Sequence, residues 1–382
     1  MKTYDWIVVG AGFTGATVAE RLASQLDQRV LVIDRRPHAA GNAYDEDEGG
    51  GLLVHKYGPH LFHTNSLKVW NYLSRFTEWR PYFHRVLGHV DGNFVPIPFN
   101  LDSIAACFPF NFGQRLCEAL IAEYGFGARP PILKLRKSTN SDVRLLADYI
   151  YEKVFKNYTS KQWDLEPDAL DPSVTARVPV EISRDGRYFH DRWQAMPKDG
   201  YTAMIGRMLD HKNIDLVLST DFRDVEPSRY RRVVFTGPID EFFDYSNGAL
   251  PYRTIRFEFV DQAAGASQPA PTVNYPNEFS FTRITDQGLV AGATQGGGKL
   301  IYEFPEAHAP GRTEPYYPIP TAQSAVMLQP YQRLAADLAG QVWFAGRLGD
   351  YAYYNMDQAC ARALALFEKQ LASAAQGRAI AV

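Results

Sequence analysis

A short glycine-rich stretch near the start of the chain has the residues to bind the pyrophosphate of a dinucleotide. It reads Gly10-Ala11-Gly12-Phe13-Thr14-Gly15. The first glycine of such a stretch makes a tight turn, the second lets backbone approach the pyrophosphate, and the third lets a helix pack closely on a strand. Asp34 lies nineteen residues after Gly15, where it could accept from a ribose hydroxyl. The alternative is a glycine-rich turn in an unrelated α/β unit.

The residues around this stretch predict the strand–helix–strand unit that would position it. Trp6–Val9 and Val30–Ile33 are continuous apolar runs, typical of strands buried on both faces. Between them, small and apolar residues recur at helical spacing: Ala16, Ala19, Leu22, Ala23 and Leu26. The glycines therefore stand in the full context of a dinucleotide-binding fingerprint.

Three arginines could recognise a phosphate, because each stands among apolar or aromatic residues and a guanidinium fork binds two oxygens at once. They are Arg177, Arg253 and Arg283. A structural ion pair is the alternative for each of them. Tyr158 and Trp163 could stack on a nucleobase, or they could be core aromatics.

Two histidines, His60 and His63, could contact a cofactor or a substrate. No cluster of Asp, Glu or Cys accompanies them, so we expect no metal site. The chain also lacks a Ser/His/Asp order and an HExxH motif, which leaves a hydrolase without support. The tyrosine-rich segments 315–318 and 351–355 offer hydroxyls that reach ligand oxygens without adding charge.

The composition is that of a globular protein of two to three domains: 382 residues, 46% hydrophobic, 22% charged and 13% aromatic. A net charge of −3 provides no field for a nucleic-acid polymer and no polybasic membrane patch. Three scattered cysteines are too few for a disulfide framework. We see neither a signal peptide nor a membrane-spanning run, so we expect a cytoplasmic protein.

A second strand–turn–helix unit near the end of the chain favours FAD over a nicotinamide cofactor. Val342–Phe344 predicts a strand, Gly346 and Arg347 a turn, and Met356 begins an apolar helical face. Such a unit can aim backbone N–H groups at a flavin ring or its ribityl chain. A nicotinamide enzyme would not need it.

The middle of the chain predicts helices over residues 100–190 and strands over residues 215–305. We expect the helices over Ser103–Cys107, Gly113–Tyr124 and Asp142–Phe155. We expect the strands over Leu216–Leu218, Arg232–Gly237 and Thr254–Phe259, the last in an antiparallel sheet with one wet face. We also expect a loop over Ala263–Pro271, a flexible tip at Gly296–Gly298 and a frayed tail over Ala372–Val382.

The segments together resemble the bacterial UDP-galactopyranose mutase family. The resemblance is carried, in family order, by GAGFTGA, GNAYD, GPHLFHT, NYTSKQW, RVPV, MPKDGYTAMI, YRT, TRIT, YYPI and GRLGDYAYYNMD. It implies an α/β fold with a Rossmann-like FAD-binding domain, an inserted helical bundle and an antiparallel β-sheet domain. The implied boundaries are 1–80, 195–245 and 320–382 for the FAD-binding domain, 98–190 for the bundle with a mobile lid, and 81–97 and 246–319 for the sheet.

The resemblance also implies a reaction and its partners. The family interconverts the pyranose and furanose forms of a nucleotide-linked sugar through attack of reduced flavin N5 on the anomeric carbon. FAD would need NAD(P)H or another reductant. The nucleotide sugar would be the partner, with no nucleic acid, no membrane and a homodimer, and the product would feed cell-surface polysaccharide biosynthesis.

Site residues follow from the resemblance position by position. Arg177 and Arg283 would clamp the diphosphate, and His60 and His63 would lie beside the flavin. The substrate would contact Tyr158, Trp163, Tyr188, His84, Asn274, Tyr317, Tyr353 and Asn355. The cofactor would contact Gly10, Gly12, Phe13, Thr14, Gly15, Asp34, Arg35, Gly41, Asn42, His60, Phe62, Phe222, Arg347 and Met356.

Departures from the family pattern leave the nucleobase and the sugar open. An amide expected near the base is replaced by Ala105 or Ala106, and Val154 stands where an aromatic is common. UDP-galactopyranose is the favoured substrate, with a GDP- or dTDP-linked hexose as the alternative. Two further hypotheses are a flavin amine or alcohol oxidoreductase and a non-catalytic flavin binder.

Overall fold

The structure of the chain, a computed structural model, describes residues 2–49, 51–170, 178–263, 268–293 and 298–377. Its first sheet has five parallel strands in the order β10-β2-β1-β11-β17. These are Tyr4–Val9 (β1), Val30–Ile33 (β2), Ile214–Val217 (β10), Tyr230–Phe235 (β11) and Val342–Phe344 (β17). The predicted strands at Trp6–Val9, Val30–Ile33 and Val342–Phe344 are confirmed.

Both faces of this sheet are covered, which explains the continuous apolar runs. One face packs on the helices Phe13–Leu26 (α1), Gly200–Leu209 (α9) and Met356–Leu366 (α14). Trp6 and Val8 face these helices, while Ile7, between them, joins the core on the other face. Because successive side chains along β1 point to opposite faces, this one strand contributes residues to both cores.

The second sheet has seven strands in the order β16-β12-β15-β14-β13-β7-β8. They are Val86–Val90 (β7), Asn93–Ile97 (β8), Tyr252–Gln262 (β12), Thr272–Asn274 (β13), Arg283–Asp286 (β14), Gly298–Ala307 (β15) and Tyr317–Pro318 (β16). All pairs are antiparallel except β13 with β7, which is parallel. The β7–β8 hairpin comes from a distant part of the chain, so no tight turn fixes its direction against β13.

Short helices follow the hairpin and share its core. They are Leu101–Cys107 (α3), Phe110–Tyr124 (α4), Ile132–Leu135 (α5) and Ser141–Ile150 (α6). Asn157–Trp163 (α7) comes later in the chain and contributes no residue to this core. Asn100 and Asn140 cap α3 and α6 with their side chains. The helix predicted over Asp142–Phe155 differs in detail, because a π-helical stretch, Tyr151–Lys156, joins α6 to α7.

Smaller elements complete the fold. The short strands are Asp45–Asp47 (β3), Leu53–His55 (β4), Phe62–Thr64 (β5), Trp79–Pro81 (β6) and Trp193–Pro197 (β9). Among the described residues, the other α-helices are Leu67–Leu73 (α2), Ile239–Phe242 (α10), Gln287–Ala291 (α11), Ala322–Asp337 (α12), Gly346–Gly349 (α13) and Ala372–Ala375 (α15). The frayed tail predicted from Ala372 is wrong over α15, because Leu371 and Ala374 are buried in the largest core.

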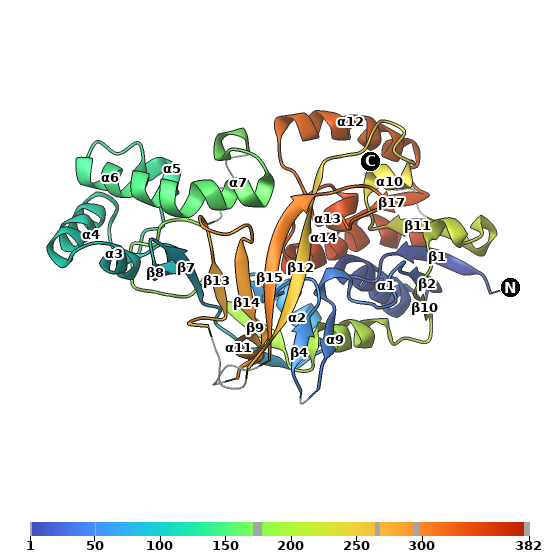
Figure 1. Cartoon of the computed structure of the whole chain (residues 1–382). Helices are drawn as coiled ribbons and strands as arrows, with labels where there is room; N and C mark the ends of the chain where they lie inside the picture. The colour runs from blue at the N-terminus through green and yellow to red at the C-terminus, as the bar shows by residue number, and fades with distance from the viewer. Residues whose placement is uncertain (1, 50, 171–177, 264–267, 294–297, 378–382) are drawn as a thin grey trace.

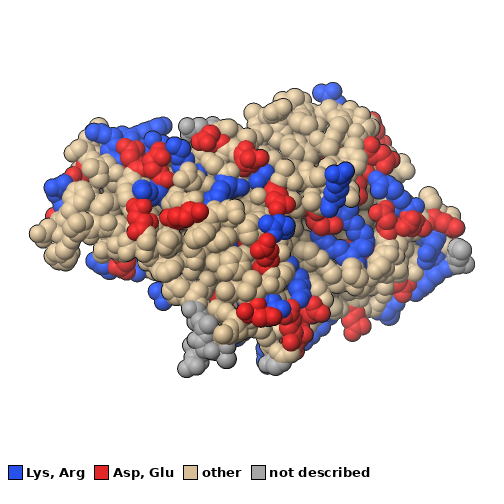
Figure 2. All heavy atoms as spheres, viewed as in Figure 1, with Lys and Arg blue, Asp and Glu red and all other residues tan. Residues whose placement is uncertain are grey.

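The two sheets and the group α3–α7 occupy different parts of the molecule (Figure 1). The seven-stranded sheet stands between the helices α3–α7 and the parallel sheet with its covering helices. The domain boundaries stay a prediction. Within the described ranges, no helix is both long enough and apolar enough to cross a membrane. Acidic and basic side chains are interspersed on the face that Figure 2 shows, without a broad area of one sign.

Candidate functional site

A cavity of about 450 Å³ lies beside the glycine-rich turn, where β1 meets α1. It is lined by the predicted cofactor residues Gly10, Gly12, Phe13, Thr14, Gly15, Asp34, Arg35, Gly41, Asn42, His60, Phe222, Arg347 and Met356. Residues from positions 9 to 359 therefore meet around one space. We refer to it as the first cavity.

The glycines of the turn are required by close approaches. A Cβ on Gly15 would lie 1.8 Å from the carbonyl oxygen of Gly10, so α1 could not begin so near β1. Gly10 has a φ of +101°, which side-chain-bearing residues rarely adopt. The start of α1 is thus held against the first cavity, and no side chain caps its first N–H groups.

Asp34 directly follows β2 and orients the backbone at the cavity wall. Its carboxylate accepts from the backbone N–H of Ala11 and of Arg36, each at 2.9 Å. Each carboxylate oxygen has a second lone pair, so both bonds leave Asp34 able to accept from a ribose hydroxyl. The acid predicted at this place fixes the turn as well.

Phe62 is the one predicted cofactor residue that does not line the first cavity. Its ring is buried in the core and stacks on Trp79, with ring centroids 4.7 Å apart. Phe62 and His63 are neighbours on β5, so their side chains point to opposite faces. Because His63 lines a cavity, Phe62 must enter the core.

A second cavity, of about 190 Å³, adjoins the first. It is lined by the predicted residues His60, His63, His84, Tyr188, Asn274, Arg283, Tyr317, Tyr353 and Asn355. The two cavities share the lining residues His60, Tyr316, Arg347, Asn355 and Met356. A ligand in the second cavity would therefore touch the end of a ligand in the first.

Arg283 brings a positive charge to the second cavity, beside that of Arg347, and is paired with a buried acid. Its Nε lies 2.8 Å from Oε1 of Glu303, which faces it across the β14–β15 pair and is 1% exposed. Burial alone would lower the pKa of Arg283, but the charge of Glu303 outweighs it and raises that pKa well above its usual value. Sequence reasoning missed Glu303. Its signal is a carboxylate at a buried position of β15, between Tyr302 and Phe304.

Two of the histidines beside the cavities, His60 and His84, are held neutral. Burial and the nearby His55 lower the pKa of His60 to about 3, while burial and Arg283 lower that of His84 to about 3. Nδ1 of His60 lies 2.9 Å from the carbonyl oxygen of Gly58 and therefore donates to it. Its Nε2 is then an acceptor.

His63 and Arg347 are fixed by the residues around them. Nδ1 of His63 lies 2.9 Å from the Asp191 carboxylate. Arg347 donates to the carbonyl oxygen of Tyr354 at 2.6 Å, and its guanidinium lies over the rings of Tyr317 and Tyr353. Arg347 thus stands at the junction of the cavities with its charge directed by backbone and aromatic rings.

Tyr158 and Trp163 lie on α7, outside the set of residues that line the second cavity. The Trp163 ring is nevertheless close to two lining tyrosines, 6.2 Å from Tyr317 and 5.9 Å from Tyr353 between centroids. Arg177 lies outside the described residues.

Arg253 is a structural residue here, as the alternative reading held. It is 4% exposed, and it donates to the carbonyl oxygens of Gln162 at 3.1 Å and Lys161 at 3.3 Å. These carbonyls end α7, where intrahelical partners run out. Asp164 lies 3.5 Å away on the other side of the guanidinium. Arg253 does not line the second cavity.

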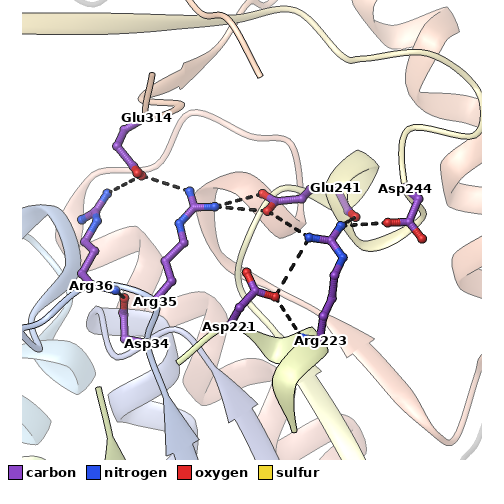
Figure 3. Close-up of polar contacts among 8 residues, drawn as sticks. All are labelled: Asp34, Arg35, Arg36, Asp221, Arg223, Glu241, Asp244 and Glu314. Atoms are coloured by element: carbon purple, nitrogen blue, oxygen red, sulfur yellow. Dashed lines mark hydrogen bonds and ion pairs between the residues drawn. The ribbon is translucent and has the colours of Figure 1, made fainter. Parts of the chain in front are cut away.

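A charged group at the wall of the first cavity was also missed by sequence reasoning. Arg36, Glu241 and Glu314 line the cavity together with Arg35 (Figure 3). They come from distant parts of the chain, so no local spacing relates them. Among the residues that the structure describes, no group of three or more His, Cys, Asp or Glu side chains could hold a metal ion.

The fold and the first cavity define a Rossmann-like dinucleotide-binding protein, and a family model described as an NAD(P)-binding Rossmann-like domain matches residues 8–76. A second family model, described as UDP-galactopyranose mutase, matches residues 153–353. The chain belongs to the UDP-galactopyranose mutase family and is an enzyme of the mutase class. The predicted family, the α/β fold and the enzyme class are thereby confirmed.

Relatives match nearly the whole chain. A probable UDP-galactopyranose mutase of Klebsiella pneumoniae is 37% identical over 378 residues, which cover 98% of this chain and 97% of that protein. A dTDP-fucopyranose mutase of Escherichia coli is 32% identical over 359 residues, covering 92% and 94%. The fold is similar to a crystal structure of reduced UDP-galactopyranose mutase, with a TM-score of 0.72, 15% identity and coverage of 98% and 96%.

Proposed function

We propose that the chain binds FAD in the first cavity and interconverts the pyranose and furanose forms of UDP-galactose in the second. The observation that carries this proposal is the contact between the cavities at His60, Tyr316, Arg347, Asn355 and Met356. A cofactor extended from the glycine turn would end where a sugar nucleotide begins. The domain boundaries, a homodimer and a cytoplasmic location remain predictions beside it.

The residues of the first cavity fit an extended dinucleotide. The glycine turn and the start of α1 suit a pyrophosphate, and Asp34 suits the adenosine ribose. Arg347 and Met356, from the strand–turn–helix unit near the end of the chain, line the opposite part of the wall, next to the second cavity. Such a two-ended cradle suits FAD, whose flavin lies beyond the pyrophosphate.

The residues of the second cavity fit the diphosphate of a nucleotide sugar. Arg283 offers a cation, while Tyr317 and Tyr353 offer hydroxyls without charge. Burial raises the pKa of Tyr317 to about 12, so this hydroxyl keeps its proton at neutral pH. An amine substrate would gain nothing from the guanidinium of Arg283 in this cavity, which argues against an amine oxidase.

These groups can lower the barrier to losing the diphosphate. The bond between the anomeric carbon and the diphosphate oxygen breaks, and the electron pair leaves with the diphosphate. Arg283 and the tyrosine hydroxyls can stabilise the charge that develops there. When bound and reduced, the flavin supplies a nucleophilic nitrogen for the anomeric carbon. His60, neutral and with Nε2 free to accept, can take a hydrogen bond from an N–H of the reduced ring.

An anaerobic assay tests the proposal. The flavin is reduced with dithionite, UDP-galactopyranose is added, and the furanose product is separated by chromatography. We expect isomerisation without net oxidation, and no turnover by the oxidised enzyme. Turnover that consumes an electron acceptor in equal amount would contradict the mutase, and equal activity in the oxidised state would contradict the nucleophilic role of reduced flavin.

The nucleotide is the second question, because one relative is named for a dTDP-linked sugar. A panel of UDP-, dTDP- and GDP-linked hexopyranoses with the reduced enzyme ranks the substrates by kcat/KM. We expect UDP-galactopyranose to lead. A higher value for a dTDP- or GDP-linked sugar would move the assignment to that nucleotide and leave the mutase reaction in place.

A further inference from the structure

Glu314 joins two consecutive arginines at the wall of the first cavity. Its Oε2 lies 3.0 Å from Nη2 of Arg35 and 3.0 Å from Nη2 of Arg36 (Figure 3). Arg35 also binds both carboxylate oxygens of Glu241, at 3.1 and 3.3 Å. We call these four residues, Arg35, Arg36, Glu241 and Glu314, the clasp.

The clasp connects three segments that are far apart in the sequence. Arg35 and Arg36 follow β2, Glu241 lies on α10, and Glu314 lies in the connection between β15 and β16. All four line the first cavity. Figure 3 shows the side chains reaching toward one another from these separate elements. Ionic hydrogen bonds, rather than apolar packing, therefore hold this part of the wall together.

The clasp also separates the first cavity from a further one. Arg35, Glu241 and Glu314 line a space of about 500 Å³ on the other side, together with Arg223 and His308. The side chains of Arg35 and Glu314 are 39% and 41% exposed. A wall of flexible side chains with space on both sides can open by rotamer changes, without unfolding the segments that carry it.

The position of the clasp identifies the part of a cofactor that it would enclose. Asp34, which precedes Arg35, marks the adenosine ribose of a dinucleotide. His60 and Met356, which adjoin the second cavity, mark the flavin end. The clasp therefore lies at the adenosine end, remote from the sugar.

The charges of the clasp favour the closed arrangement. Burial raises the pKa of Glu314, but the charges of Arg35 and Arg36 outweigh it and lower that pKa below its usual value. Glu314 is therefore ionised at neutral pH. A carboxylate repels a pyrophosphate, so its place in the wall suits a bond between protein segments and not a bond to the cofactor.

We propose that the clasp closes the adenosine end of the first cavity and limits the rate at which the cofactor leaves. This inference rests on the proposed function, because it takes FAD as the occupant. FAD exits only when Glu314 releases the two arginines, and the same opening admits it to the empty protein.

The test measures FAD release from the purified flavoprotein by the rise of flavin fluorescence after a large dilution, with a phosphodiesterase present to cleave the released FAD so that it cannot rebind. Glu314→Gln keeps the shape of the side chain and removes its charge. We expect release to become about 3- to 10-fold faster, the scale of losing two partly exposed ion pairs. The control is Glu368→Gln, which breaks the exposed Lys68–Glu368 pair, away from the residues that line the first cavity, and leaves the rate unchanged.

Salt provides a test that needs no variant. The screening length falls from about 10 Å at 0.1 M to about 3 Å at 1 M, so wild-type release accelerates with KCl. Release from Glu314→Gln responds less, because its main ionic contact is gone. If circular dichroism shows that Glu314→Gln does not fold, Glu241→Gln replaces it, because this variant removes the other carboxylate that Arg35 binds. The salt series with the wild type does not depend on either variant.

Several results would overturn the clasp. One is release from Glu314→Gln at the wild-type rate, together with no response of wild type to salt. Slower release from the variant would mean that the freed arginines hold the pyrophosphate themselves. A flavoprotein without mutase activity contradicts the proposed function and leaves this test intact, whereas a chain that takes up no FAD contradicts both.

Discussion

Arg283 and Glu303 face each other on neighbouring strands, with 2.8 Å between the Arg283 Nε and the Glu303 Oε1. The pair sits in the wall of the second cavity, and Glu303 is almost completely buried. The charge of Glu303 raises the pKa of Arg283, so the guanidinium stays protonated and is held at this wall before a substrate arrives.

Arg283→Ala should abolish isomerisation while the protein keeps its flavin. The variant removes the cation that stabilises the departing diphosphate, and we expect kcat/KM to fall at least about 1,000-fold, the scale of losing a key electrostatic group. Arg283 does not line the first cavity, so the flavin absorbance should persist. The measurement is the anaerobic assay with an absorbance spectrum of each sample.

The control for this variant is Arg256→Ala, on the exposed part of β12, where Arg256 pairs with Glu258 and Glu306. It should keep the wild-type rate. A variant at position 283 that retains activity would remove Arg283 from the reaction.

The sequence predicted the parts of the site that depend on neighbours in the chain. The turn from Gly10 to Gly15, the strand β2 and the acid Asp34 belong to one continuous unit, whose pattern is local. Glu303 and Glu314 could not be predicted in this way. Each acquires its role from an arginine that the fold brings from another part of the chain.

Arg253 shows that a local pattern can also suggest a ligand contact where the fold provides a different partner. Its apolar surroundings suggested a phosphate ligand, and its guanidinium instead meets the carbonyls that end α7. Composition around a residue can indicate that a charge is buried, but it does not say which partner the fold provides. Phe62 does not line the first cavity for a related reason. Neighbouring side chains on β5 point to opposite faces, so Phe62 enters the core while the next residue faces a cavity.

Arg253→Ala should destabilise the protein through α7. It leaves the carbonyls of Lys161 and Gln162 without their buried donor, and we expect the free energy of unfolding to fall by about 2–3 kcal/mol. Urea unfolding followed by circular dichroism measures the change. Arg231→Ala, at an exposed position of β11, should change it by less than about 0.5 kcal/mol. A loss confined to substrate KM, with stability unchanged, would return Arg253 to the phosphate site.

Gly15→Ala should prevent cofactor binding. The new methyl group would lie 1.8 Å from the carbonyl oxygen of Gly10, so α1 must move away from β1 and the pyrophosphate cradle is lost. We expect a colourless protein with a lowered melting temperature. Gly206→Ala is the matched change on α9, where the added Cβ meets nothing within 4 Å, and it should raise stability by about 0.5–1 kcal/mol. A yellow Gly15→Ala protein would contradict the role of the glycine turn.

Three histidines with lowered pKa values should make the protein sensitive to mild acid. Burial lowers the pKa of His55 to about 4, and the pKa values of His60 and His84 are lowered to about 3 by burial first, with His55 and Arg283 adding to it. In the unfolded chain each titrates near 6.5. Between these values the unfolded chain binds protons that the folded one does not, so the free energy of unfolding falls as the pH falls below about 6.5. At pH 5 the loss is about 2 kcal/mol for each histidine, an upper bound from a shift of this size.

Urea unfolding at pH values from 7.5 to 5 measures this loss above the range where carboxylates titrate. His84→Asn removes one titrating group and keeps a polar side chain beside Tyr82, whose hydroxyl lies 3.1 Å from Nδ1 of His84. Its stability should therefore depend less on pH than that of the wild type, by up to about 1.4 kcal/mol per pH unit. An equal dependence in the two proteins would mean that His84 takes up its proton in the folded state, and that water reaches this side chain although it is only 2% exposed.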